Sequence, residues 1–372
     1  MPLTVLSVAY PFASVGPDAV GGAEQVLSAL DRALVRNGHR SLVIACEGSV
    51  AAGELVPLSV PAGRIDDEVR RRTWAGLKRL IEKVAAAEKI DLVHLHGIDF
   101  HAYLPDRVPT LATLHLPLDW YPDWIFEPRS NLWLNCVSEA QHRTAPAGAS
   151  LLPPIANSVP QKLFETRQRK RDHAIVLSRI CPEKGIHLAL QACRLADVPL
   201  LIGGQVFPYE VHQRYFHDEV VPLLHSRRRF LGPLGFNRKR RLLAAARCAI
   251  VPSLAAETSS LSAIEALACG TPVIAFPNGA LPEVIEHGRT GFTVNDVSEM
   301  AEAITAASSI DPEACRAAAW ERFSPNRMER RYLDLYGKLA GVVRTLQSRR
   351  GESVLGRGDA PTFGHGSAAR SR

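Results

Sequence analysis

The chain has 372 residues, of which 46% are hydrophobic, 22% charged and 6% aromatic. This length is about twice that of a typical domain, and the apolar content suffices for packed cores, which excludes a peptide-sized or broadly disordered protein. The net charge is +6, but five arginines in residues 348–372 supply much of the excess. The rest of the chain is nearly balanced, so no nucleic-acid partner is expected.

The seven cysteines indicate a reducing compartment. They are odd in number, are scattered along the chain and form no C-x-x-C pair. Neither a disulfide framework nor a zinc site is implied. No stretch approaches 18 apolar residues, and the first apolar run has no basic residue before it. We therefore expect a cytoplasmic protein that does not span a membrane.

The predicted elements alternate between short apolar strands and longer helices. In the first half, strands are predicted at Thr4–Ala9, Ser41–Cys46, Asp91–Leu95, Thr110–Leu114 and Leu132–Val137, with helices at 22–37 and 66–88. In the second half, strands are predicted at Ala174–Ser178, Leu200–Gly203, Arg229–Leu231, Ala249–Val251 and Val273–Ala275. Apolar strands joined by helical crossovers predict an α/β protein with parallel sheets that are covered on both faces.

Two such series, each of about 150 residues, predict two doubly wound, Rossmann-like domains rather than one large sheet. A proline-rich and then strongly basic segment at 153–172 marks the join. The expected domains are residues 1–160 and 161–325. A C-terminal helix is expected at 326–347, and a disordered tail rich in Gly, Ser and Arg at 348–372.

The segment that follows the strand ending at Val251 has the features of an anion-binding site. Ser259 or Ser260 is suited to cap a helix there. A helix start at the carboxyl end of a strand offers unpaired N–H groups to an anion such as a diphosphate. Glu257 before it and Glu265 beyond it could accept hydrogen bonds from ligand hydroxyls. The plainer alternative is a capped helix with two surface glutamates.

A second cluster, Arg179 to Lys184, follows the first strand of the second half. Two cations five residues apart across a turn can converge on one pair of phosphates, where Arg makes a forked contact and Lys a point contact. Taken alone, this spacing is also typical of a solvated turn.

The first half offers two smaller candidates. Gly21 and Gly22 open a helix and allow a ligand to approach the backbone closely. His115 follows the strand Thr110–Leu114. The alternatives are an ordinary helix start and a packed histidine.

Together these segments resemble glycosyltransferase family 4, whose members have the GT-B fold and use nucleotide sugars. The resemblance rests on the E-x7-E pattern within residues 252–275, on the Arg179–Gly185 turn, on the Gly-Gly loop and on the Thr-x-His segment ending at His115. It extends over about residues 3–340 and implies two domains facing across a cleft, with the acceptor side in the first and the nucleotide-sugar donor in the second.

The resemblance also implies roles for individual residues. The family's Arg and Lys hold the donor diphosphate, and Glu257 would position the sugar, Glu265 the ribose and His115 a sugar hydroxyl. The expected catalytic residues are Glu257, His115, Arg179 and Lys184. The expected donor-binding residues are Gly21, Gly22, Arg179, Lys184, Ser259, Ser260, Leu261 and Glu265. Family membership implies retention of anomeric configuration with no metal or other cofactor, and the sequence contains no D-x-D metal motif.

Residues 258–260 depart from the family pattern, because Thr-Ser-Ser replaces the usual Gly-Phe-Gly. This departure leaves an alternative to a transferase, namely a noncatalytic subunit that binds nucleotide sugars. A nicotinamide oxidoreductase is disfavoured, since no G-x-G-x-x-G follows the first strand.

The expected partners are a nucleotide-sugar donor and a glycan or lipid-linked acceptor. Weak peripheral contact with the inner face of the membrane is a further hypothesis. It rests on Arg72, Arg79 and Lys83, which share one face of the predicted helix 66–88. A solvated helix face is the favoured interpretation of this stripe, because acidic residues dilute it.

Overall fold

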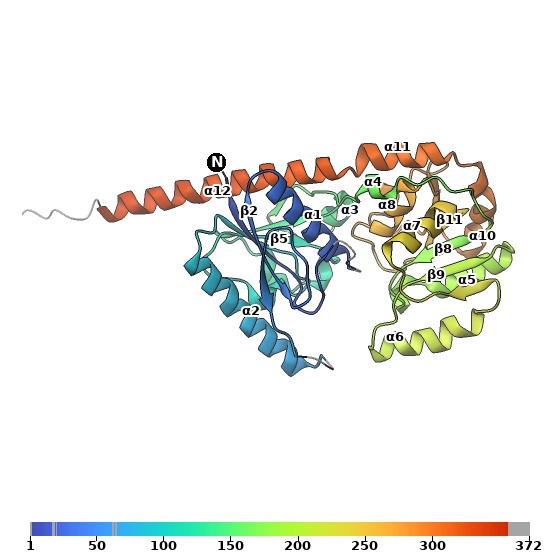
Figure 1. Cartoon of the computed structure of the whole chain (residues 1–372), viewed down its shortest axis with the longest axis horizontal. Coiled ribbons are helices and arrows are strands. Elements are labelled where there is room, and N and C mark those ends of the chain that lie inside the picture. The colour runs from blue at the N-terminus through green and yellow to red at the C-terminus, as the bar shows by residue number, and fades with distance from the viewer. Residues whose placement is uncertain (1, 17–18, 20, 62, 64, 356–372) are drawn as a thin grey trace, which may run out of the picture.

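Two parallel sheets form the two halves of the protein, side by side (Figure 1). The structure is a computed structural model that describes residues 2–16, 19, 21–61, 63 and 65–355, with side chains as far as residue 341. The two α/β domains confirm the predicted fold class of two Rossmann-like domains.

The N-terminal domain has a seven-stranded sheet in the order β3-β2-β1-β4-β5-β6-β7, with every strand pair parallel. Its strands are β1 Thr4–Val8, β2 Arg40–Cys46, β3 Glu54–Leu58, β4 Leu92–Leu95, β5 Thr110–Leu114, β6 Leu132–Cys136 and β7 Leu151–Leu152. Its helices are α1 Gly22–Arg36, α2 Asp67–Ala87 and α3 Glu139–Arg143. The order reverses at β1 and β4, and in open α/β sheets this reversal is where ligands bind.

The C-terminal domain has a six-stranded parallel sheet in the order β10-β9-β8-β11-β12-β13. Its strands are β8 Ala174–Leu177, β9 Leu200–Gly203, β10 Arg228–Phe230, β11 Cys248–Val251, β12 Val273–Ala275 and β13 Gly291–Thr293. Its helices are α4 Gln161–Phe164, α5 Ile186–Leu195, α6 Glu210–Tyr215, α7 Phe236–Ala245, α8 Leu261–Ala268, α9 Leu281–Val284, α10 Val297–Ala306 and α11 Pro312–Arg322. Here the order reverses between β8 and β11.

Alternating side chains of the strands are buried on both faces of each sheet, as parallel strands require. In the N-terminal domain, Leu6 packs with Leu77 of α2 on one face, and Val5 packs with Leu30 of α1 on the other. The C-terminal domain repeats this arrangement with α7, α8 and α11 on one face and α5 and α10 on the other. The packed faces fix the strands, and the strand ends position the loops of the cleft.

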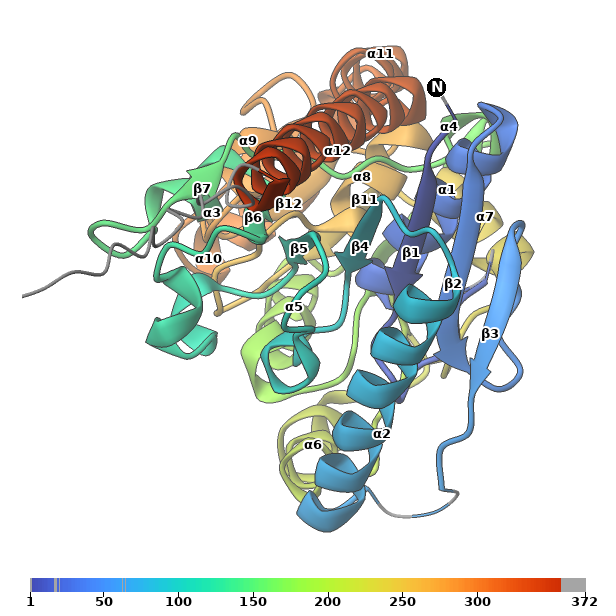
Figure 2. The same ribbon diagram turned by 90° about the vertical axis from the view of Figure 1, so that its left-hand side faces the viewer.

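The last helix, α12 Pro325–Leu355, returns from the C-terminal domain to the first sheet (Figure 2). Tyr332 and Tyr336 are fully buried there and pack in one cluster with Val5, Leu30 and other residues of β1 and α1. The helix was expected to end at residue 347, before a disordered tail. It instead continues to Leu355, because no proline interrupts it and an established helix adds residues at little cost. Residues 356–372 of the expected tail lie outside the described residues.

Three edge strands were not predicted from the sequence: β3, β7 and β13. Pro57 lies within β3 and is tolerated because an edge strand leaves one row of N–H groups unpaired. β7 has only two residues, and β13 reads Gly-Phe-Thr, so neither forms an apolar run that the sequence would reveal. Among the helices in the described part of the chain, none is long and apolar enough to cross a bilayer.

Candidate functional site

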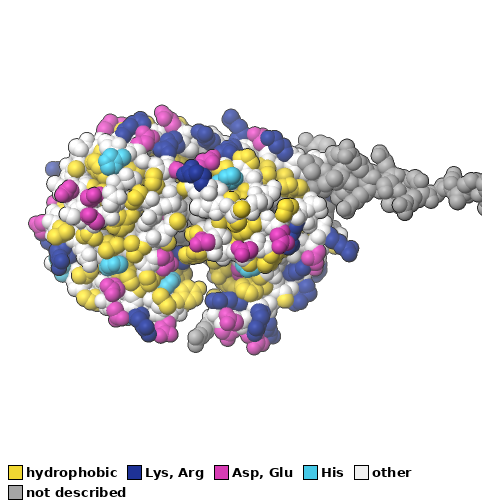
Figure 3. Space-filling view, turned by 180° about the vertical axis from the view of Figure 1, so that it is seen from behind, with side chains coloured by type: hydrophobic (Ala, Val, Ile, Leu, Met, Phe, Trp, Pro, Cys, Tyr) yellow, Lys and Arg dark blue, Asp and Glu magenta, His cyan; other side chains and the backbone are white. Residues whose placement is uncertain are grey.

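A cavity of about 1460 Å³ lies between the two domains and is lined by residues of both. Seen from behind, the surface is hollowed between the two halves (Figure 3). All the residues expected to be catalytic line this cavity, and so do all the expected donor-binding residues except Glu265. The tertiary structure thus brings together positions as far apart in the chain as 21 and 261.

The topology explains why these residues meet. Arg179 and Lys184 follow β8, Glu257 follows β11, and His115 follows β5. The carboxyl ends of parallel strands lie at one edge of a sheet. In each domain that edge faces the cleft, so short loops carry the polar side chains to the same cavity from two sides.

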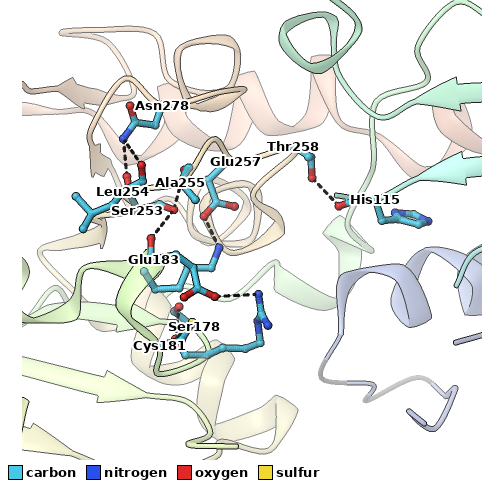
Figure 4. A network of polar contacts seen from close by, with 12 residues as sticks. His115, Ser178, Cys181, Glu183, Ser253, Leu254, Ala255, Glu257, Thr258 and Asn278 are labelled. Atoms are coloured by element: carbon cyan, nitrogen blue, oxygen red, sulfur yellow. Dashed lines mark hydrogen bonds and ion pairs between the residues drawn. The ribbon is translucent and has the colours of Figure 1, made fainter. Parts of the chain in front are cut away.

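Two opposite charges pair at the centre of the C-terminal wall (Figure 4). Lys184 Nζ lies 2.5 Å from Glu257 Oε1, with side-chain exposures of only 22% and 12%. Arg179 Nη2 lies 3.9 Å from Glu183 Oε1, and its side chain is 44% exposed. The cation of Lys184 is therefore held at a fixed point of the wall, while Arg179 remains accessible to a ligand from the cavity.

The start of α8 faces the same cavity without a side-chain cap. Ser259 or Ser260 was expected to cap this helix. Ser260 does occupy the N-cap position, but its φ is +58° and its hydroxyl makes no cap bond, so the predicted capping bond is absent there. Its Oγ is buried and has no hydrogen-bond partner among the described residues. Gly22, at the start of α1, faces Leu261 across the cleft, since an added Cβ would lie 3.2 Å from Leu261 Cδ1. Two helix starts, each with a partial positive charge, thus converge here.

Glu265 lies in a second cavity of about 620 Å³, which shares Arg179 and Leu261 with the first. Its Oε1 is 2.6 Å from Lys239 Nζ, and the two side chains are 6% and 19% exposed. Burial raises the pKa of Glu265, and Lys239 opposes that rise. The pair thus places a carboxylate and an ammonium group on the wall of the cavity that adjoins the first.

His115 connects the two domains at the opposite wall. The hydroxyl of Thr258 donates a hydrogen bond of 2.9 Å to the His115 carbonyl oxygen (Figure 4). Burial lowers the pKa of the His115 imidazole to about 4. The ring is therefore neutral at physiological pH and contributes hydrogen bonds rather than charge.

Sequence reasoning missed some cleft residues. Glu24, in the first turn of α1, is 6% exposed and lines the cavity, and burial raises its pKa. It stands beside the Gly-Gly pair in the sequence, so position alone could have suggested it. Lys239 could not have been found in this way, because only the packing of α7 against α8 brings it to Glu265.

Gly279 supports the loop that carries Glu257, and we expect its substitution by alanine to destabilise the protein more than an alanine at an unobstructed glycine does. Its φ is +63°, and a Cβ would lie 2.2 Å from the Glu257 carbonyl oxygen. Gly288 is the matched control, because its φ is +77° but no atom of the described residues lies within 4 Å of its Cβ position. Gly288→Ala should cost only the backbone strain of about 1 kcal/mol. Urea denaturation of the two variants measures their losses of stability, and equal losses would contradict this account.

His94 lies in β4 and His96 follows directly after this strand, and both side chains are buried. Their burial predicts that the protein loses stability in acid. Burial lowers the pKa of His94 and His96 well below the ordinary value of 6.5. Both bind protons in the unfolded chain below that value but not in the folded protein, so the free energy of unfolding falls as the pH falls. At about pH 5.5 we expect a loss of about 1.4 kcal/mol for each imidazole, relative to about pH 8.

Urea denaturation at the two pH values measures this loss. His96→Gln should reduce it, whereas replacement of the exposed His217 by glutamine should leave it unchanged. Equal stability of the unaltered protein at both pH values would refute the prediction.

Comparison with known families gives two matches in chain order. Residues 20–149 match the model described as Glycosyltransferase Family 4, and residues 171–309 match the model described as Glycosyl transferases group 1. Together they take in most of both domains and cover the loops that carry His115, Arg179, Lys184 and Glu257.

Individual relatives are similar over parts of the chain. A D-inositol 3-phosphate glycosyltransferase of Mycobacterium sp. (strain KMS) is 34% identical over 173 residues, which is 44% of this chain and 38% of that protein. One component of the human phosphatidylinositol N-acetylglucosaminyltransferase is 23% identical over 72% of this chain and 61% of its own length. The aligned regions therefore span less than two thirds of these relatives.

Solved structures share the fold. A sucrose-phosphate synthase from Thermosynechococcus elongatus has a TM-score of 0.75 at 20% identity, covering 91% of this chain and 99% of its own. The Anabaena protein HepE, in complex with UDP-glucose, has a TM-score of 0.67 at 20% identity, covering 93% of this chain and all of its own. At these identities the likeness concerns the fold alone.

Proposed function

Because the chain belongs to the group 1 glycosyltransferases of family 4, we propose that it transfers a sugar from a nucleotide-diphosphate sugar to a hydroxyl acceptor. One observation carries this proposal: Arg179, Lys184 and the uncapped start of α8 line one cavity together with Glu257. These groups are of the kind that binds a diphosphate, and the carboxylate beside them can hold sugar hydroxyls.

The proposed mechanism relies on electrostatic stabilisation of the leaving group. When the anomeric bond breaks, negative charge grows on the departing diphosphate, and donors that are already in place lower the barrier. Arg179, Lys184 and the N–H groups of α8 would meet this charge. The Ser260 hydroxyl, which is buried without a partner among the described residues, would donate one more hydrogen bond. Retention of configuration and independence of metal are part of the proposal, as the family resemblance implies.

The proposed binding mode divides the donor between the two cavities. The diphosphate would lie where they meet, at Arg179 and Leu261, with the nucleoside toward Glu265 and the sugar toward Glu257 and His115. The Anabaena protein HepE, which shares this fold, has been solved in complex with UDP and glucose and with UDP-glucose, which supports a nucleotide-sugar donor here. The acceptor, a glycan or a lipid-linked sugar, would enter from the N-terminal side.

A thermal-shift panel of nucleoside diphosphates and their sugars tests the donor class. A ligand that binds only the folded state raises the melting temperature by mass action, so the true donor should give the largest shift. Slow hydrolysis of that donor, followed as release of free sugar, would then separate a transferase from a protein that only binds nucleotide sugars. If none of the panel shifts the melting temperature, the proposal fails.

Peripheral membrane contact is a separate proposal. Arg72, Arg79 and Lys83 are exposed on α2, and Arg72 lies 3.8 Å from Glu68. Flotation with anionic liposomes at low and high salt tests this proposal. Equal recovery of the protein with neutral and with anionic liposomes would contradict it.

A further inference from the structure

A continuous series of polar side chains runs from the wall of the cleft to the C-terminal helix. His115 Nε2 lies 3.3 Å from His96 Nδ1, and His96 Nε2 lies 3.1 Å from His94 Nδ1. Beyond His94, the hydroxyl of Tyr336 on α12 lies 2.7 Å from the same Nδ1. His94 and His96 are 0% and 1% exposed, so water cannot satisfy these groups.

The direction of the hydrogen bonds can be deduced from a carbonyl group, which only accepts. Asn135 Nδ2 donates to the carbonyl oxygen of Cys136 at 3.2 Å, so Asn135 Oδ1 is the atom that faces Thr113. The Thr113 hydroxyl donates to that oxygen at 2.8 Å and has no second hydrogen. It lies 2.8 Å from His94 Nε2, so it accepts there, and His94 Nε2 carries a hydrogen.

The same assignment of donors and acceptors can be continued from His94 toward the cleft. A neutral imidazole has one N–H, so His94 Nδ1 is bare, and the Tyr336 hydroxyl, 2.7 Å away, donates to its single lone pair. His96 Nε2, 3.1 Å from the same nitrogen, shares that lone pair and carries its hydrogen there, because two bare nitrogens at this distance would repel each other. His96 Nδ1 is then bare, and His115 Nε2 donates to it. His115 Nδ1 is left with a lone pair and no hydrogen-bond partner among the described residues, on a residue that lines the cavity.

A hydrogen bond in the opposite direction, donated by Thr113 to His94, is unfavourable. If Thr113 donated to His94, Asn135 Oδ1 would be buried without its donor, since Asn135 is fully buried. An unsatisfied buried acceptor costs about 1–3 kcal/mol. Burial also keeps all three imidazoles neutral by lowering the pKa of each.

We infer that His94, His96 and Thr113 are positioning residues that fix the tautomer of His115, so that its Nδ1 accepts a hydrogen bond from a ligand hydroxyl in the cleft. The nature of that ligand, the sugar of the donor, rests on the proposed function. The specificity follows from the chemistry: this wall of the site selects a hydroxyl that donates and disfavours an ether oxygen or a fluorine at the same place.

Nuclear magnetic resonance of the full chain with 15N-labelled histidine tests the tautomer without any ligand. His115, identified by the loss of its signals in His115→Gln, should be protonated at Nε2. Thr113→Val removes the acceptor of His94, so a second tautomer should appear at His115, two histidines away. Thr113→Ser should restore the original signals. Thr110→Val is the matched control, because Thr110 is buried on the same strand but donates to the Val108 carbonyl.

Protonation of His115 at Nδ1 in the unaltered protein would overturn the inference, and so would unchanged His115 signals in folded Thr113→Val. If that variant does not fold, His96→Leu gives the second test. It removes the acceptor of His115 Nε2, so the 15N signals of His115 should move toward the average of the two tautomers, and unchanged signals would again overturn the inference.

Binding measurements separate this inference from the proposed function. In Thr113→Val, affinity for the nucleotide sugar should fall about tenfold, the worth of one hydrogen bond, while affinity for the free nucleoside diphosphate stays unchanged. Equal losses for both ligands would contradict the inference. If neither ligand binds the unaltered protein, the proposed function fails, and the tautomer measurement still decides the inference.

Discussion

Alanine in place of Lys184 is expected to lower the turnover of a nucleotide-sugar donor by about 10²- to 10³-fold. Lys184 Nζ is held at the cavity wall by Glu257 at 2.5 Å. A cation fixed before the reaction needs no reorganisation when charge grows on the leaving diphosphate, so its removal acts mainly on kcat. Turnover of the donor identified by thermal shift, measured as free nucleotide, reports the effect.

Three further variants test whether the loss of turnover comes from removing the cation of Lys184. Lys83→Ala removes an exposed lysine of α2 and should leave turnover unchanged. Arg179→Ala should lower turnover by about 10²-fold, since Arg179 lines the same cavity. Lys184→Ala combined with Glu257→Gln removes the unpaired carboxylate that Lys184→Ala alone would leave, and should remain slow. A folded Lys184→Ala protein with full turnover would show that this lysine does not meet the leaving group.

Replacing Lys239 with alanine is expected to destabilise the protein by about 3–5 kcal/mol at neutral pH. The carboxylate of Glu265 is 6% exposed, and the ammonium of Lys239, 2.6 Å away, is its only ionic partner in the described part of the chain. Without Lys239, a buried charge would remain unpaired, and its pKa would rise further. Urea denaturation measures the loss.

The pH dependence of this loss has a definite sign. A carboxyl whose folded-state pKa is raised binds its proton more strongly in the folded protein, so the loss in Lys239→Ala should shrink as the pH falls through that raised pKa. Arg238→Ala is the matched control, because Arg238 is the exposed neighbour on the same helix. Lys239→Ala combined with Glu265→Leu should recover most of the stability. A deficit independent of pH would contradict a role for the unpaired carboxylate.

Much of the fold follows from local sequence patterns. Nearly continuous apolar runs located the central strands β1, β2, β4 and β5, because strands buried on both faces need apolar side chains at most positions. The edge strand β3 was missed, since its Pro57 and half-exposed residues match no such run. Whether a segment becomes an edge strand depends on which other strand lies beside it. That depends on the tertiary structure and not on the local sequence.

The candidate site shows the same division. Four of the site residues lie just after strands, and this position in the sequence predicted that they share the ligand-binding edge of the sheets: Arg179, Lys184, Glu257 and His115. Ser260 was one of two serines expected to cap α8, but its backbone is left-handed and its hydroxyl makes no capping bond. Capping depends on the backbone angles of one residue, which residue type alone does not determine.

The order of residues by itself determined two parallel α/β domains and the polar loops at the strand ends, because periodicity and spacing act over a few residues. Only the tertiary structure decided which groups pair: Lys184 with Glu257 across 73 positions of sequence, and His94 with Tyr336 across 242. Such pairs depend on how helices and loops from distant segments cross, and no local propensity records that geometry. The chemistry of the cleft thus rests on residue types that the sequence displays and on contacts that packing alone creates.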